Sequence, residues 1–166
     1  EGRICLDVGA STGGFTDVLI QSGAAKVYAV DVGREQFHTS LKNHSRIISM
    51  EGTDARGLTA DILSPPPSLI VCDASFISLT KILSVPLCLA AGKAELVTLV
   101  KPQFEVGKKN IGRGGIVKDD GCAEAALEDV QMWISSQSWA IKGHTHSPIK
   151  GGSGNTEFLV YAARVE

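Results

Sequence analysis

The amino-acid sequence predicts a doubly wound α/β domain, in which helices cover both faces of a mainly parallel seven-stranded sheet. Apolar stretches typical of β-strands alternate along the chain with segments of helical periodicity. Two further apolar stretches follow the last helical segment and bring the number of strands to seven. A length of 166 residues with 43% hydrophobic and 20% charged residues fits one such domain.

Strands are expected at residues 3–8, 26–32, 46–50, 68–73, 95–101, 140–144 and 157–163, and helices at 14–22, 34–43, 78–90 and 119–137. The third helical segment carries Ile82, Leu83 and Leu87 at a spacing that places apolar side chains on one helix face. The fourth segment begins with two aspartates, whose negative charge is favourable at a helix N-terminus. The pattern therefore predicts a sheet whose strands are connected by helices.

A glycine-rich turn follows the first expected strand, where residues 6–15 read LDVGASTGGF. Glycines allow a ligand to approach the backbone, and the following helix N-terminus offers unpaired N–H groups. Asp31 ends the second strand, where a carboxylate can accept both hydroxyls of a ribose. The spacing is not GxGxxG, and no Lys-Ser or Lys-Thr pair follows, which disfavours dinucleotide and triphosphate sites. The turn predicts a nucleoside pocket; a simple strand-to-helix turn is the alternative.

Polar side chains end the expected strands. Asp7, Asp31, Asp73 and Lys101 each end an apolar run, and the segment MEGTDAR at residues 50–56 follows the third strand. Ligands of open α/β sheets bind outside the carboxyl ends of the strands, so these side chains are expected around one crevice. Asp54 is expected to accept the exocyclic amine of an adenine, with a solvated loop carboxylate as the alternative.

Lys101, Asp73 and Glu157 are the candidate catalytic residues. A lysine that ends a buried strand needs an anionic neighbour, and Asp73 at the adjacent strand end is the expected partner. Glu157 begins the last strand after the glycine-rich segment 151–156 and can reach the same crevice. A lysine between two carboxylates can hold an alcohol and help to remove its proton. A purely structural ion pair is the alternative.

Seven motifs follow one another along nearly the whole chain: LDVGASTGGFTD, YAVDVG, VCDASFISL, LVKPQFEVG, GGIVKD, SPIKG and GNTEFL. In this order they resemble the methyltransferase domain of the TlyA/hemolysin A family, within the FtsJ-like 2′-O-ribose RNA methyltransferases. The resemblance implies a Rossmann-like methyltransferase sheet over residues 1–166. It also implies S-adenosyl-L-methionine as the cofactor and a ribose 2′-hydroxyl of ribosomal RNA, or of ribosomal subunits, as the substrate.

The resemblance assigns roles to individual residues. FtsJ-like enzymes use a Lys-Asp-Lys-Glu tetrad, of which Asp73, Lys101 and Glu157 match the last three members. The first Lys and an N-terminal S4-type RNA-binding domain are expected upstream of Glu1, so the chain reads as an excised domain that can bind cofactor and still be inactive. The residues expected at the cofactor are Asp7, Gly9, Ala10, Ser11, Gly13, Gly14, Phe15, Asp31, Val32, Asp54, Ala55 and Asp73.

A long connection rich in glycine and lysine joins the fifth strand to the last helix. Its basic side chains are expected to hold RNA phosphates beside the catalytic residues, and they are Lys108, Lys109, Arg113 and Lys118. Phe76 or Phe104 is expected to stack on a base. A solvated loop with buried aromatic rings is the alternative.

Charge and composition limit the remaining functions. A net charge of −2 and a pI of 6.1 do not by themselves indicate a nucleic-acid binder. No apolar run reaches the roughly 20 residues that span a bilayer, which predicts a cytoplasmic protein without a membrane partner. Four separated cysteines predict reduced, mostly buried thiols without a disulfide or a metal site. A membrane-acting hemolysin, a non-catalytic RNA-binding module and a small-molecule methyltransferase remain as alternatives.

Overall fold

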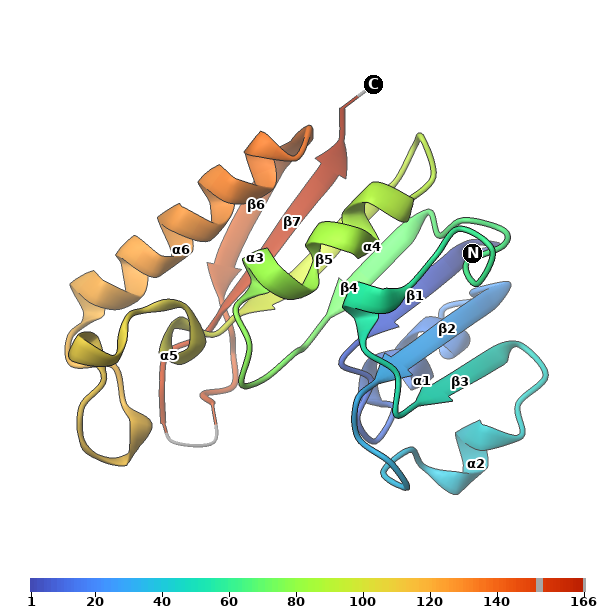
Figure 1. Ribbon diagram of the computed structural model, residues 1–166, viewed down its shortest axis with the longest axis horizontal. Coiled ribbons are helices and arrows are strands. Elements are labelled where there is room, and N and C mark those ends of the chain that lie inside the picture. The colour runs from blue at the N-terminus through green and yellow to red at the C-terminus, as the bar shows by residue number, and fades with distance from the viewer. Residues whose placement is uncertain (152–153, 166) are drawn as a thin grey trace.

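The computed structural model describes residues 1–151 and 154–165, and a seven-stranded sheet forms its central layer (Figure 1). The strand order is β3-β2-β1-β4-β5-β7-β6. β1 to β5 run parallel to one another, whereas β7 runs antiparallel to both β5 and β6. The strands are β1 (Ile4–Val8), β2 (Lys26–Asp31), β3 (Ile47–Glu51), β4 (Leu69–Cys72), β5 (Glu95–Val100), β6 (Trp139–His146) and β7 (Phe158–Arg164).

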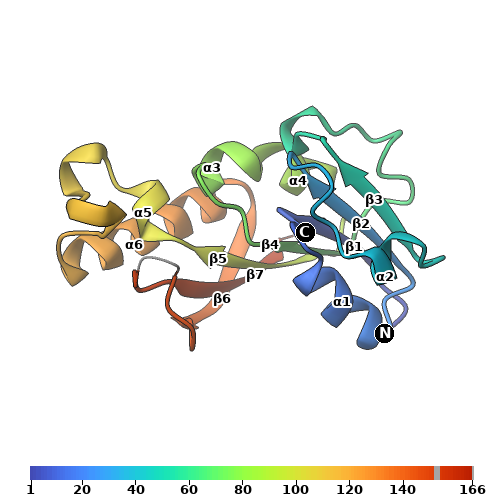
Figure 2. The ribbon, with the colours of Figure 1, turned by 90° about the horizontal axis from the view of Figure 1, so that it is seen from below.

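Helices cover both faces of the sheet, as the sequence predicts. α1 and α2 pack on one face, and α3, α4 and α6 pack on the other; Figure 2 shows α1 opposite α3 and α4. The helices are α1 (Gly14–Gln21), α2 (Thr39–Lys42), α3 (Leu79–Ile82), α4 (Ser84–Leu89), α5 (Pro102–Glu105) and α6 (Asp120–Ser136). Short 3-10 turns occupy Ala55–Gly57, Lys108–Asn110 and Arg113–Gly115.

Strand alternation divides the apolar side chains into two cores. Leu6 and Ile70 point toward α3, α4 and α6, whereas Val27 and Val71 on neighbouring strands point toward α1 and α2. Both kinds of position are buried, since a parallel sheet with helices on its two faces has few solvated strand positions. These cores hold the carboxyl ends of β1, β2, β4 and β5 in fixed register.

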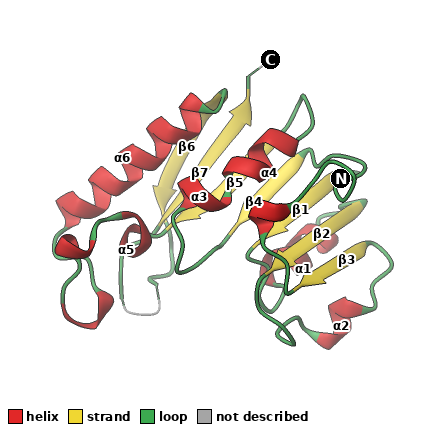
Figure 3. Cartoon of the chain, in the orientation of Figure 1, coloured by secondary structure: helices red, strands yellow, loops and turns green. Residues whose placement is uncertain are grey.

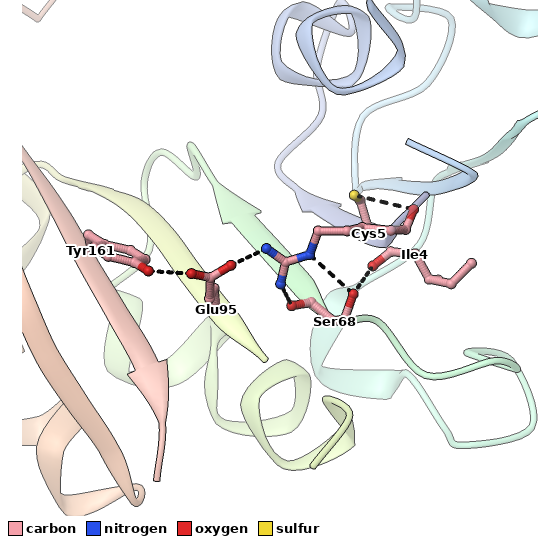
Figure 4. Close-up of polar contacts among 6 residues, drawn as sticks. Ile4, Cys5, Ser68, Glu95 and Tyr161 are labelled. Carbon is pink, nitrogen blue, oxygen red and sulfur yellow. Dashed lines mark hydrogen bonds and ion pairs between the residues drawn. The ribbon is translucent and has the colours of Figure 1, made fainter. Parts of the chain in front are cut away.

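The face of β5 and β7 that lies on the α1 side is only partly covered. Leu96 and Ala162 on the opposite face are fully buried, whereas Tyr161 is 40% exposed. The Tyr161 hydroxyl donates a hydrogen bond to Glu95, which also pairs with Arg3 (Figure 4). Arg3 further donates to the Ser68 carbonyl oxygen, so this network joins the beginning of β1 to β4, β5 and β7.

The helix expected at residues 34–43 is wrong over most of its length. α2 covers only Thr39–Lys42, and a loop precedes it (Figure 3). The Glu51 carboxylate accepts hydrogen bonds from the backbone amides of Gln36 and Phe37, at 2.8 and 3.1 Å. Glu35 has a φ of 59°, which is incompatible with a right-handed helix. A side chain from β3 therefore satisfies the backbone groups that a longer helix would have used.

The helix expected at residues 78–90 is two helices, α3 and α4, which meet at Leu83. Pro86 has no amide hydrogen to donate to the carbonyl of Ile82, and its ring crowds that carbonyl. The break therefore lies one turn before the proline. Asp119 and Asp120 are placed as predicted, because Asp119 caps α6 by accepting a hydrogen bond from the Cys122 amide at 2.8 Å.

The four cysteines are free thiols. Cys5 and Cys72 are buried, and desolvation raises the pKa of their thiols to about 11 and about 12. Cys88 is exposed and Cys122 is half-buried, so the expectation of buried thiols is correct for two positions and wrong for Cys88. Nothing in this distribution indicates a reactive thiolate near the sheet edge.

Candidate functional site

A cavity of about 540 Å³ lies where β1, β2 and β4 end. Seven of the predicted cofactor residues line it: Gly9, Ser11, Asp31, Val32, Asp54, Ala55 and Asp73. Apolar side chains of Val8, Val30, Ile77 and Ile82 contribute to the same wall, together with the exposed ring of Phe76. The cavity thus combines an apolar surface with three carboxylates, which is a suitable composition for a nucleoside that carries a positively charged group.

Asp31 organises the glycine-rich turn. Its Oδ2 accepts a hydrogen bond from the Ser11 amide at 2.8 Å, and its Oδ1 accepts one from the Gly33 amide at 2.7 Å. Ser11 has a φ of 47°, a left-handed conformation that the bond to Asp31 helps to maintain. Each carboxylate oxygen retains a second lone pair, so Asp31 can hold the turn and still accept from a ligand.

The glycines of the turn serve packing within the protein. Gly9 has a φ of 80°, and a Cβ on it would lie 3.0 Å from the Cα of Ala74. A Cβ on Gly13 would lie 2.5 Å from Leu41 Cδ1, whereas one on Gly14 would meet open space. Packing within the protein accounts for Gly13, whereas Gly9 both packs against Ala74 and lines the cavity. Gly9 allows β1 and β4 to end side by side, and Gly13 allows α1 to pack near α2.

Five predicted cofactor residues are not among those that line the cavity: Asp7, Ala10, Gly13, Gly14 and Phe15. Asp7 points to the α1 face of the sheet, where its Oδ2 accepts a hydrogen bond from the Thr16 hydroxyl at 2.7 Å. It is fully buried, and desolvation raises the pKa of its carboxyl group to about 6. Its Oδ1 has no hydrogen-bond partner among the described residues. Asp7 therefore holds the first turn of α1 through Thr16, on the α1 face of the sheet, and does not line the cavity.

Asp54 lines the cavity but is already paired with Arg56. The Arg56 side chain donates to both oxygens of Asp54, with Nη2 lying 2.6 Å from Oδ2, and the Arg56 amide donates to Oδ1 at 2.9 Å. The guanidinium holds the pKa of the Asp54 carboxyl group below its usual range. An ionised Asp54 is an acceptor for an exocyclic amine, and Arg56 orients it. Arg56 also lines the cavity, and the sequence analysis did not identify it.

Lys101 and Asp73 form the expected ion pair at the rim of the cavity. The Lys101 ammonium nitrogen lies 2.6 Å from Asp73 Oδ1 and donates to the Ser75 hydroxyl at 2.8 Å. The Lys101 side chain is 13% exposed and that of Asp73 is 42% exposed, so the cation is the more enclosed partner. An ammonium has three N–H donors, and these two contacts leave one for a substrate oxygen.

Glu157 lies on the strand next to Lys101 but has a different partner. Val100 pairs with Phe158 in the β5–β7 ladder, so Lys101 and Glu157 follow at the same edge of the sheet. Because β7 is antiparallel, its beginning lies beside the carboxyl ends of the parallel strands. Glu157 is 7% exposed, and its Oε1 accepts a hydrogen bond from Gln103 Nε2 at 3.0 Å. Lys101 was expected to lie between two carboxylates, but it pairs with Asp73 and not with Glu157, which bonds to Gln103 instead.

Two further residues on α5 support this arrangement and were missed by the sequence analysis. Gln103 holds Glu157, and Glu105 accepts hydrogen bonds from the Ser78 hydroxyl at 2.6 Å and the Leu79 amide at 2.8 Å. Glu105 therefore connects α5 to the N-terminus of α3. Both residues belong to the motif LVKPQFEVG. Pro102 favours the start of a helix directly after Lys101, and this feature of the sequence could have indicated that Gln103 and Glu105 lie near Lys101.

The four predicted RNA-binding side chains, Lys108, Lys109, Arg113 and Lys118, are all exposed on the segment that follows α5. Figure 1 shows this segment beside α5 and the β6–β7 connection, at the edge of the sheet where β5 ends. Phe76 is 90% exposed, has a φ of 65° and packs against Phe104 with ring centroids 5.1 Å apart. The alternative of two buried rings is therefore wrong for Phe76. Residues 152 and 153 of the expected glycine-rich segment lie outside the described residues.

Within residues 1–151 and 154–165, no three or more His, Cys, Asp or Glu side chains are arranged to hold a metal ion. In the same part of the chain, no helix combines the length and the apolar character that crossing a membrane requires.

Comparison with known proteins identifies relatives of high similarity. FtsJ-like methyltransferases match residues 1–164. The chain is 45% identical over 160 residues to the 16S/23S rRNA (cytidine-2′-O)-methyltransferase TlyA of Mycobacterium tuberculosis, covering 96% of this chain and 60% of that protein. It is 43% identical over 162 residues to Hemolysin A of Brachyspira hyodysenteriae, covering 97% of this chain and 68% of that protein.

Solved structures of similar fold support the same family. A "putative hemolysin" from Streptococcus thermophilus superposes with a TM-score of 0.96 at 42% identity, covering all of this chain and 60% of the other. The magnesium protoporphyrin IX methyltransferase of Synechocystis PCC 6803 gives a TM-score of 0.66 at 14% identity, covering 98% of this chain and 74% of the other, and so shares the fold. This chain spans about three fifths of the length of the mycobacterial relative. From the match over nearly all of its residues, the chain belongs to the FtsJ-like methyltransferase family.

Proposed function

We propose that this chain is the catalytic domain of a methyltransferase that uses S-adenosyl-L-methionine to methylate a ribose 2′-hydroxyl in ribosomal RNA. The observation that carries the proposal is the ion pair between the largely buried Lys101 ammonium and Asp73, at the rim of a cavity lined by three carboxylates. A ribosomal substrate implies a cytoplasmic site of action. The relatives carry the names of two different activities: the M. tuberculosis protein is named for rRNA methylation and the B. hyodysenteriae protein for hemolysis. Hemolysis is therefore the alternative function.

The cavity residues fit S-adenosyl-L-methionine by the chemistry of their side chains. Asp31 offers acceptors for the two ribose hydroxyls, and Asp54 offers an acceptor for the adenine amine. Ile77 and Ile82 supply apolar surface for the adenine ring, while Asp73 supplies negative charge for the sulfonium side of the molecule. The cofactor, when bound, supplies an electrophilic methyl group.

Lys101 has the central role in the proposed reaction. Asp73 and Ser75 hold its nitrogen in place at the rim of the cavity, where a substrate alcohol would approach. As a neutral amine, Lys101 Nζ would orient the ribose 2′-hydroxyl and receive its proton while the 2′-oxygen bonds to the methyl carbon and the methyl–sulfur bond of the cofactor breaks; Lys101 would then be the ammonium partner of Asp73. Glu157 adds negative charge at the same edge of the sheet, and Gln103 fixes the direction of its carboxylate. The low exposure of Lys101 and Glu157 strengthens their electrostatic interactions.

RNA is the proposed substrate because exposed basic side chains lie next to this site. Lys108, Lys109 and Arg113 can contact phosphates without sequence preference, whereas the exposed ring of Phe76 can stack on one base near Asp73. A small-molecule acceptor would not require such a basic segment. Purified protein that releases dye from liposomes, without methylating RNA, would favour the hemolysin alternative instead.

The substitution Lys101→Arg tests the proposal. Arginine keeps the positive charge for Asp73, but it cannot lose a proton near neutral pH and its planar fork replaces a compact ammonium. In the full-length protein we expect cofactor affinity to remain within a few-fold, while methyl transfer to ribosomal RNA falls by a factor on the order of 10² to 10⁴.

The matched control is Lys93→Arg, which changes an exposed lysine before the amino end of β5, at the opposite end of that strand from Lys101 and outside the cavity lining. This variant is expected to retain wild-type transfer. Wild-type rates for Lys101→Arg as well would show that Lys101 is a structural ion-pair partner, and the proposed chemistry would have to be abandoned.

A further inference from the structure

Asn155 is a buried amide that the proposed chemistry does not use. It is 3% exposed and lies two residues before Glu157. Its Oδ1 accepts a hydrogen bond from the Val117 amide at 2.9 Å, and its Nδ2 donates to the Gly115 carbonyl oxygen at 3.0 Å. One acceptor and one donor directed at a neighbouring backbone are what a peptide group of an adjacent strand would provide. The Asn155 side chain thus pairs with the backbone of residues 115–117 in the way that a peptide group of a neighbouring strand would.

The backbone that Asn155 holds belongs to the basic segment after α5. Residues 110–118 fold back on themselves through a bridge between Ile111 and Val117, and the Lys118 amide donates to the Asn110 carbonyl oxygen at 3.0 Å. Neither 3-10 turn of this segment contains a buried residue. Val117 packs against the hydrophobic core at one end of the segment, whereas polar contacts hold the rest of it, and segments with few apolar contacts open easily.

The other side of Asn155 faces the turn that carries Glu157. The Asn155 carbonyl oxygen accepts a hydrogen bond from the Gly151 amide at 3.0 Å. A Cβ on Gly151 would overlap Glu157 Oε1, so the Gly151 backbone lies directly against this carboxylate. Asn155 is therefore connected on one side to the basic segment and on the other side to the surroundings of Glu157.

We propose that Asn155 is a positioning residue that fixes the basic segment against the Glu157 turn, so that RNA bound by the segment presents its ribose to Lys101. This inference rests on the proposed function. It predicts a division of effects: loss of the Asn155 amide should weaken the productive binding of RNA, while the cofactor cavity, whose lining does not include Asn155, should keep its affinity.

The substitution Asn155→Ala removes both side-chain hydrogen bonds. In the full-length protein we expect the KM for ribosomal RNA to rise about tenfold, the cost of two lost hydrogen bonds of ordinary strength. We expect kcat to change less than about threefold and the Kd for S-adenosyl-L-methionine less than about twofold. Amide hydrogen exchange over residues 111–118 should become faster, while exchange in β1 and β4 stays at the wild-type rate.

Asn155→Asp is the second variant, because it keeps the size of the side chain and the acceptor for the Val117 amide but loses the donor to Gly115. It should show the same division between KM and kcat. Asn43→Ala is the control, since Asn43 is exposed at the end of α2 and distant in sequence from both segments. It should match the wild-type protein in every measurement.

The outcomes separate this inference from the proposed function. A wild-type enzyme that methylates RNA, together with an Asn155→Ala variant whose KM and segment exchange are unchanged, overturns the positioning role alone. A loss of cofactor affinity in both Asn155 variants also overturns it, because the effect would then be general. If the wild-type protein transfers no methyl group to RNA, the proposed function fails, and the role of Asn155 in RNA presentation fails with it. Faster exchange over residues 111–118 in Asn155→Ala would then show only a structural anchor.

Discussion

Replacing Asp7 by asparagine should change how the stability of the protein depends on pH. Asp7 is fully buried on the α1 face, and desolvation, opposed by the hydrogen bond from Thr16, raises the pKa of its carboxyl group from 3.8 to about 6. The native state therefore holds a proton on Asp7 over a range in which the unfolded chain has released it. Between pH 4 and pH 6 the native protein loses stability as the pH rises.

The size of this effect follows from the pKa difference. A shift of about two units, at about 1.4 kcal/mol per unit, corresponds to about 3 kcal/mol of stability that is present below pH 4 and lost above pH 6. Other carboxyl groups act in the opposite direction. The pKa of Glu51 is held at about 2 by Lys42 and by backbone amides, so its contribution is lost as the pH falls. Those groups are present in both proteins, and a comparison with Asp7→Asn removes their contribution.

The assay is urea unfolding of the wild-type protein and of Asp7→Asn at half-unit steps from pH 4.5 to pH 8, without cofactor. The free energy of unfolding of Asp7→Asn minus that of the wild type should rise by about 2 kcal/mol across this range, because about 1 kcal/mol of the effect already develops below pH 4.5, and it should level off above about pH 7. The absolute offset between the two proteins also contains the cost of the new amide N–H group and is not diagnostic. Parallel stability profiles would show that Asp7 titrates normally and would refute the argument from burial.

Three further predictions concern the turn, the cofactor and the RNA. Gly9→Ala should lower the free energy of unfolding by about 1 to 3 kcal/mol, because Gly9 has a φ of 80° and its new Cβ would lie 3.0 Å from the Cα of Ala74. Gly14→Ala is the control: its Cβ would meet open space, and it should lower the free energy of unfolding by less than about 0.5 kcal/mol. Equal losses in urea unfolding would contradict the packing role of Gly9. Asp31→Ala should weaken S-adenosyl-L-methionine binding by roughly 1.5 to 3 kcal/mol in calorimetry, and unchanged affinity would remove Asp31 from the site. Lys108→Ala and Lys109→Ala should each weaken the binding of many RNA sequences alike and reduce the salt slope by about 1; an altered sequence preference at constant slope would contradict phosphate contacts.

Most of the strands were predictable from the sequence because they are apolar runs that end in or are followed by a polar residue; β6 is the exception, with only its first three residues apolar. The expected bounds differ from the observed ones by at most two residues at each end, and the Lys101–Asp73 pair follows from the order of strand ends in a doubly wound sheet. The break at Leu83 was not predicted, although Pro86 one turn later is a local signal for it. These features depend on local sequence and on general rules of topology.

Contacts between distant segments were not predictable in the same way. The loop before α2 depends on Glu51 from the neighbouring strand, and the orientation of Glu157 depends on Gln103 from α5. The sequence likewise suggested that Gly13 faces a ligand, whereas it faces Leu41. In each case the deciding partner is remote in sequence, and the residue type alone does not reveal it.

The most direct measurement is methyl transfer from radiolabelled S-adenosyl-L-methionine to ribosomal RNA by the full-length protein, followed by nucleoside analysis of the RNA. The proposed function predicts label on a ribose 2′-oxygen in the wild-type reaction, where it protects the adjacent phosphodiester bond from alkaline cleavage. Lys101→Arg should transfer label about 10² to 10⁴ times more slowly while still binding the cofactor. Label found on a base, or no transfer by folded wild-type protein that binds both the cofactor and RNA, would contradict 2′-O-methylation.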